Sequence, residues 1–391
     1  MAQAKYSYFN PIGDPGKIPA LDGLRAFAIL LVLFRHTATG IRDNFSISES
    51  TNGPLWNMAL NGWLGVDLFF VLSGFLVGYH IIRYWPSEAY ADFFKRYWLK
   101  RVLRTFPLYY AVIFIVILEL VPLFKLHSTD ILRSLGIHIV FMQDYMGTDL
   151  LVPFWSLATE EKFYFFAPFL IGGLLYAKKI NGSLVPIIIG VLIISSLIIR
   201  NIQINETQIF SYPHFFWVFR APFHFAIQGL LLGLAVAFLK SKHWQPNYFS
   251  NTLFNSDTLF KISVVVLFVI LISDEWMSQD SNWMVTSNIL FLININFAVM
   301  IYACVNSNRL NQSWLGGPTL RLFARLSYSL YLIHYLLVPW SANISKNIVD
   351  AHWAAYPLFV LIYLGITMVA AYLLHVTVEK PFLLLKDKIR P

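Results

Sequence analysis

The sequence contains little cysteine and little charge. Cys304 is the only cysteine among 391 residues, so an internal disulfide and a cysteine-based metal site are both excluded. Charged residues make up 13% of the chain, about half of what a soluble domain carries. Hydrophobic residues reach 57%. This balance argues against an ordinary soluble enzyme and predicts a membrane protein with several spans.

Signals for secretion, nucleic-acid binding and metal binding are also missing. Residues 1–20 are polar and contain Pro11, Pro15 and Pro19, so no cleavable signal peptide is expected. The net charge of +8 does not indicate nucleic-acid binding, because Lys and Arg are already expected beside membrane helices. No two histidines stand four residues apart with a third ligand, so no metal site is predicted.

Apolar segments long enough to cross a bilayer recur along the chain. A membrane helix needs roughly 17–25 apolar residues. The shorter segment 131–142 is placed in or on the membrane interface. We predict an all-α polytopic protein, a single domain over 1–391 with a helical core at about 21–378. Its transmembrane helices number about ten, over 21–39, 62–82, 105–124, 155–177, 184–200, 217–239, 258–273, 285–305, 321–341 and 355–378.

Basic residues indicate the orientation of these helices. With the N-terminus in the cytoplasm, most Lys and Arg fall in inner loops, whereas outer loops are acidic or neutral, as at Asp274, Glu275 and Asp280. Because cytoplasmic loops carry the excess of Lys and Arg, both termini are predicted to be cytoplasmic.

The first apolar segment carries Arg25 and His36, eleven residues apart. Eleven helical steps make roughly 1100°, or three turns plus about 20°, over a rise of roughly 16 Å. Both side chains therefore lie on one face of one helix. This spacing suggests a continuous site that runs through the bilayer.

Other titratable residues are predicted near the depth of His36, in the outer part of the membrane. Ionisable groups in the hydrocarbon are costly unless paired, so each is a functional candidate. Asp67 would orient His36 or cap the start of its own helix. Facing the interior of the bundle is the cheapest way to satisfy the rest of this set, which comprises Glu160, Glu161, Arg220, His224 and His334.

The cytoplasmic end is basic. Arg101 and Arg104, three residues apart, lie on one helix face and could form a basic mouth with Arg25. Arginine binds phosphate through charge-assisted, often bidentate hydrogen bonds, although ordinary cytoplasmic anchoring would also explain the pair. A phosphate-binding end and a histidine base at the other end are typical of group transfer from a phosphorylated carrier to a hydroxyl.

Six motifs, in this order, resemble the membrane-bound acyltransferase family 3, which O-acylates bacterial surface carbohydrates. They are Leu21 to Arg25 followed by His36, the segment 65–75, Arg101 and Arg104 followed by Pro107, Trp155-Ser156-Leu157 followed by Glu160, Glu161, Phe163 and Tyr164, the segment 327–334, and the segment 378–382.

The resemblance implies roles for five of these residues. His36 would be the catalytic histidine, and Arg25 would be essential beside it. Arg101 and Arg104 would help to hold an acyl-coenzyme A donor, and Glu160 would support the site. The sixth helix departs from the family pattern, because His224 stands where many members have Asp and Arg220 is shifted. Arg35, beside His36, is a further departure, and it would snorkel outward or bind an anionic acceptor.

The predicted function is a multi-pass O-acyltransferase of the bacterial cytoplasmic (inner) membrane. It would move an acetyl or short acyl group from cytoplasmic acetyl-CoA or another acyl-CoA to a hydroxyl of a surface or secreted carbohydrate. His36 would act as general base or carry the acyl group itself. No SGNH-type domain is expected after the last helix, so a second catalytic module would be a separate periplasmic partner. Alternatives are acylation of a cytosolic small molecule and transport of acyl groups or glycan precursors.

Overall fold

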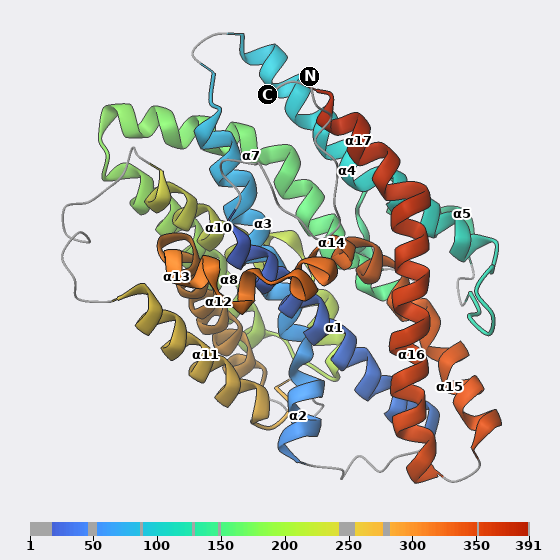
Figure 1. Ribbon diagram of the computed structural model, residues 1–391. Coiled ribbons are helices and arrows are strands. Elements are labelled where there is room, and N and C mark those ends of the chain that lie inside the picture. The colour runs from blue at the N-terminus through green and yellow to red at the C-terminus, as the bar shows by residue number, and fades with distance from the viewer. Residues whose placement is uncertain are drawn as a thin grey trace.

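The computed structural model describes residues 18–45, 53–86, 89–126, 130–147, 150–241, 255–276, 282–349 and 352–389. All regular structure in these ranges is helical (Figure 1). The α-helices are α1 Pro19–Phe45, α2 Pro54–Leu60, α3 Leu64–Arg83, α4 Tyr90–Ile117, α5 Ile131–Ile139, α6 Gln143–Met146, α7 Trp155–Ile180, α8 Leu184–Glu206, α9 Tyr212–Phe215, α10 Phe223–Lys240, α11 Ser256–Ile272, α12 Trp283–Asn306, α13 Asn308–Gln312, α14 Pro318–Ile333, α15 Val338–Ile348, α16 His352–Leu374 and α17 Lys380–Asp387.

Seven helical segments of the described chain are long and apolar enough to cross a membrane. Three predicted spans fall outside this set. Helices α11 and α14 have only 17 and 16 residues, and the first half of α4 is rich in charge. The all-helical membrane architecture is therefore confirmed. The number of about ten spans and the cytoplasmic placement of both termini stay predictions.

Helix α1 lies in the centre of the bundle, between α3 on one side and α14 on the other (Figure 1). Helix α3 packs in turn against α10 over most of its length. Two glycines allow this close approach. A Cβ at Gly74 would come within 2.0 Å of the Leu230 carbonyl oxygen, and one at Gly233 within 2.0 Å of the Val71 carbonyl oxygen. Small residues at such crossings are how membrane helices bring their backbones together.

Helix α4 begins well before the predicted span 105–124. Its first half carries charged residues, so hydropathy does not reveal it, although its Arg and Lys are good helix formers. The helix ends at Ile117, two residues before Glu119, which has a left-handed φ of 47°. As predicted, the short apolar segment 131–142 does not form a span. It contains α5, which has nine residues.

Two predicted spans are interrupted, and both interruptions contribute to the site described below. The predicted span 321–341 is split into α14, a 3-10 turn His334–Leu337 and α15. Pro339 in α15 has no N–H with which to continue the α-helical ladder. The predicted span 217–239 is split in the same way, with a π turn Phe216–Arg220 before Pro222 and α10. Hydropathy averaged over a whole span does not reveal either break, although Pro222 and Pro339 are local signals of a helix interruption.

Candidate active site

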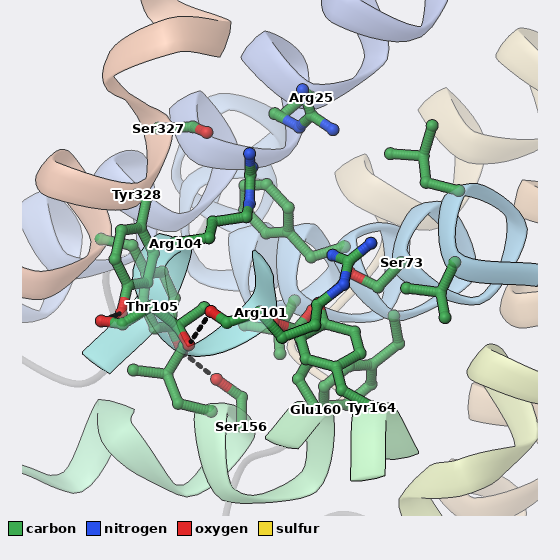
Figure 2. A pocket seen from close by; sticks show the side chains of 17 residues that line it. Arg25, Ser73, Arg101, Arg104, Thr105, Ser156, Glu160, Tyr164, Ser327 and Tyr328 are labelled. Carbon is green, nitrogen blue, oxygen red and sulfur yellow. Dashed lines mark hydrogen bonds between the residues drawn. The ribbon is translucent and has the colours of Figure 1, made fainter. Parts of the chain in front are cut away.

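Arg25 and His36, on the same helix, line two different cavities that adjoin. The first, named here the arginine cavity, has a volume of about 210 Å³ and contains Arg25 (Figure 2). The second, the histidine cavity, has a volume of about 310 Å³ and contains His36. Val66 and Tyr331 line both cavities. The predicted continuous site along α1 thus takes the form of two chambers that share a wall.

The arginine cavity is strongly basic. Arg25 enters from α1, and Arg101 and Arg104 enter from α4 (Figure 2). The guanidinium group of Arg101 lies 5.1 Å from the centre of the Tyr164 ring and 5.6 Å from that of Tyr97. Such cation–π contacts hold the guanidinium without neutralising it. The structure therefore brings the three predicted arginines together around one space.

Two carboxylates only partly balance these cations. The Arg25 Nη1 atom lies 3.6 Å from Asp22 Oδ1, one turn earlier in α1. Glu160, from α7, accepts a hydrogen bond of 2.6 Å from the Ser73 hydroxyl, and the Tyr164 hydroxyl donates to Ser73 Oγ over 3.1 Å. Three arginines against two carboxylates leave the cavity suited to an anion. Glu160 belongs to this cavity, whereas its predicted depth grouped it with His36.

The histidine cavity is lined by His36, and a second imidazole, that of His334, lies directly behind it. His36 is half-buried, and its ring centre lies 4.8 Å from that of His334 and 5.2 Å from that of Tyr335. His334 is fully buried at the start of the 3-10 turn that follows α14. The interruption of this span therefore places His334 beside His36. Depth alone had put the two histidines at one level, and the structure shows that they meet.

Asp67 pairs with Arg220 in the wall of this cavity. Arg220 Nη2 donates to Asp67 Oδ2 over 2.8 Å, and both side chains are buried. The guanidinium group also lies 4.6 Å from the centre of the Trp63 ring and 5.5 Å from that of Trp155. Asp67 was expected to orient His36 or to cap the start of its own helix, and Arg220 was a candidate at the same depth without an assigned partner. The two residues share a predicted depth, but a single sequence does not reveal which helix faces meet.

The second cation of the histidine cavity is also paired. Arg35 Nη1 lies 2.5 Å from Glu275 Oε1 and donates to the Leu60 carbonyl oxygen over 2.7 Å. Glu275 comes from the loop after α11, which was predicted to be acidic and to lie on the outer side. Arg35 is thus held by a carboxylate of this chain. His224, by contrast, is exposed and interacts with the Tyr145 hydroxyl at 2.9 Å, away from both cavities.

Aromatic rings form much of the remaining wall of the histidine cavity. One of these rings, Tyr331, lines both cavities, and its hydroxyl donates to the Pro153 carbonyl oxygen over 2.7 Å. The same hydroxyl lies 2.6 Å from Ser156 Oγ, which faces the arginine cavity. The aromatic members are Trp63, Trp155, Tyr212, Phe216, Trp217 and Tyr331. In the part of the chain that is described, no cluster of three His, Cys, Asp or Glu is placed to hold a metal ion.

Comparison with known proteins identifies relatives of this chain. A family model described as an acyltransferase domain matches residues 18–376. A provisionally named O-acetyltransferase of Staphylococcus aureus strain COL is 28% identical over 387 residues, covering 93% of this chain and 57% of the relative. YrhL of Bacillus subtilis strain 168, provisionally named a peptidoglycan O-acetyltransferase, is 26% identical and is covered over 54% of its length.

The O-acetyltransferase OatA of Staphylococcus aureus strain NCTC 8325 is 27% identical over 353 residues, covering 83% of this chain and 51% of the relative. The chain therefore spans about half the length of the curated relatives that it matches. No solved structure matches it significantly.

Proposed function

Because the chain belongs to acyltransferase family 3, we propose that it is a membrane O-acyltransferase that uses acetyl-CoA or another short acyl-CoA to acylate a carbohydrate hydroxyl. The observation that carries this proposal is the pair of adjoining cavities with different chemistry. One is lined by cations and the other by His36 and aromatic rings. A donor and an acceptor would enter from opposite ends and react at the shared wall.

The arginine cavity would receive the donor. Coenzyme A carries several phosphate charges, and guanidinium groups bind phosphate through short, often bidentate hydrogen bonds. Arg25, Arg101 and Arg104 supply three such groups, with Arg101 held against Tyr164. With both termini in the cytoplasm, this cavity would open toward the cytoplasmic pool of acyl-CoA.

The histidine cavity would receive the acceptor. Its two cations are each paired with a carboxylate, Arg35 with Glu275 and Arg220 with Asp67. The cavity therefore offers little uncompensated charge, and its aromatic rings suit the apolar face of a sugar. An uncharged hydroxyl-bearing ring fits this wall better than an anion does. The names of the relatives, which include a peptidoglycan O-acetyltransferase, agree with a carbohydrate acceptor.

His36 would carry out the proton transfer. An unprotonated ring nitrogen takes the proton from the acceptor hydroxyl while the oxygen attacks the thioester carbonyl. The new C–O bond forms, the C–S bond breaks, and the proton passes from His36 to the leaving thiolate of coenzyme A. In a second route, the same nitrogen attacks the thioester carbonyl first, the C–S bond breaks and the coenzyme A thiolate leaves; the acceptor hydroxyl then displaces the imidazole from the acyl group and gives up its proton to it. Trapping an acyl group on His36 would distinguish the second route from the first.

The protein would be a multi-pass protein of the bacterial inner membrane that acts on a surface or secreted glycan. A separate periplasmic partner would present or finish the product if the transfer needs a second catalytic module. Purified protein in detergent, mixed with acetyl-CoA and a cell-wall glycan extract, tests the reaction class. Release of free coenzyme A together with acetylated glycan is expected. A pure transporter would produce neither.

A further inference from the structure

His334 has one ring nitrogen whose role is fixed by the backbone. Its Nδ1 atom lies 2.8 Å from the carbonyl oxygen of Tyr331 and 3.2 Å from that of Leu330. Carbonyl oxygens only accept hydrogen bonds, so Nδ1 must carry the hydrogen. The ring thus folds back over the last turn of α14, as that of His138 does over Ser134 in α5.

The other nitrogen is left without a partner. Among the residues that the structure describes, none forms a hydrogen bond with His334 Nε2, although the side chain is fully buried. A second proton on the ring would place a cation away from water, which is unfavourable in a membrane interior. In the neutral ring Nε2 therefore presents a lone pair. A buried lone pair of this kind requires a hydrogen-bond donor.

His36 is the candidate donor because its ring contacts that of His334, although no hydrogen bond joins the two rings in the structure itself. The centres of the two rings lie 4.8 Å apart, and the ring planes are inclined by 54°. Two imidazoles that share one N–H···N hydrogen bond have centres roughly 5 Å apart, given a bond length of about 3 Å. His36 lines the histidine cavity on one side and contacts the ring of His334, which does not line it, on the other.

We propose that His334 is a positioning residue for His36. Its Nε2 atom accepts a hydrogen bond from one N–H of His36 and thereby directs the unprotonated nitrogen of His36 into the histidine cavity. This inference rests on the proposed role of His36 as base or acyl carrier. When His36 takes the hydroxyl proton, its cavity-facing nitrogen becomes N–H, and the hydrogen bond to His334 persists and stabilises the new imidazolium.

The carboxylates that would usually serve this purpose are engaged elsewhere. Asp67 is bound to Arg220, and Glu160 is bound to Ser73 in the arginine cavity. A neutral acceptor fixes the tautomer of His36 without adding a negative charge to the cavity. This agrees with a cavity in which the other charged groups are already paired.

Chemical labelling of His36 tests the proposal without knowledge of the acceptor. Diethyl pyrocarbonate acylates an unprotonated imidazole nitrogen, and peptide mass spectrometry follows the rate at each histidine of the purified full chain. In His334→Leu, we expect His36 to label about tenfold more slowly, the lower end of the effect of losing such an orienting partner. In His334→Gln, the side-chain oxygen still accepts a hydrogen bond, so the rate is expected to stay within about threefold of the wild type.

His224 serves as the internal control, because it is exposed and lies outside both cavities. Its labelling rate should be equal in all variants. If His334→Leu does not give a monodisperse protein, His334→Met replaces it. If His36 were labelled at the wild-type rate in His334→Leu or His334→Met, the proposal would be overturned. It would also be overturned if His36 were labelled as slowly in His334→Gln as in His334→Leu. If His36 has no catalytic role, the His36→Ala protein will remain active, whatever the labelling result.

Discussion

Asp67 of α3 and Arg220, which precedes α10, form a buried ion pair of 2.8 Å in the wall of the histidine cavity. Loss of one partner leaves an uncompensated charge in the membrane interior. Asp67→Asn should therefore lower the free energy of unfolding by about 3–5 kcal/mol, and the double variant Asp67→Leu/Arg220→Met should recover part of the loss. Thermal unfolding in detergent measures the difference.

The pair formed by Arg309 and Asp257 provides the matched control, because Arg309 is 81% exposed and the separation is 3.5 Å. Arg309→Gln should change the melting temperature little. Equal melting of Asp67→Asn and the wild type would mean that the buried pair does not hold α3 to α10.

The arginine cavity predicts how donor binding responds to substitution. Arg101→Ala and Arg104→Ala should each raise KM for acetyl-CoA by roughly ten- to a hundredfold, because a hydrogen bond to a charged group contributes about 1.5–3 kcal/mol. Steady-state kinetics with varied acetyl-CoA measure this effect.

Arg96, on the same helix, is the control for charge alone. Its side chain is exposed and bonds to the backbone of Asp92 outside the cavity. Arg96→Ala should leave KM unchanged. If it weakened donor use as much as Arg101→Ala, general attraction to the basic surface would explain the result, and the cavity would not.

Glu160 is expected to act through its hydrogen bond with Ser73. The amide oxygen of Glu160→Gln still accepts from the serine hydroxyl, so this variant should keep most activity. Glu160→Ala should lower kcat/KM by roughly five- to a hundredfold, because it leaves the half-buried Ser73 hydroxyl without its acceptor, at a cost of about 1–3 kcal/mol. Comparison of the two variants at saturating acceptor checks this. Equal loss in both would show that the negative charge matters more than the hydrogen bond.

Charge pairing in the histidine cavity predicts the preferred acceptor. Methyl β-D-glucoside and methyl β-D-glucuronide share a ring and differ by one carboxylate. With Arg35 and Arg220 already paired, the uncharged glycoside should be acylated at least about tenfold faster, since an unpaired buried charge is costly. Product mass spectrometry on an equimolar mixture gives the ratio. Preference for the glucuronide would mean that one of the two arginines is free to bind an anion.

Sequence reasoning predicted the helical architecture and the stripe of Arg25 and His36, because both depend on periodicity within one segment. Hydropathy also located most of the apolar helices. It did not find the breaks before His334 and after Arg220, since hydropathy averaged over a span is insensitive to single residues such as Pro222 and Pro339. These breaks determine where two of the site residues lie.

A single sequence did not predict which residues of different helices contact each other. Depth grouped Asp67, Glu160 and His334 with His36, but depth does not specify which face of a helix meets which neighbour. In the structure, Asp67 meets Arg220, Glu160 lines the arginine cavity, and His334 contacts His36. Which of these residues meet depends on how each helix is rotated about its own axis, and a single sequence does not specify that rotation.

In the proposed reaction, His36 is required for the transfer of an acyl group to a surface glycan. Mass spectrometry of surface polysaccharide from cells that lack the gene, complemented with wild type or His36→Ala, tests it most directly. We predict a mass increase of one acyl group with the wild type and none with His36→Ala present at equal membrane abundance. Restoration of the same mass increase by His36→Ala would contradict the account.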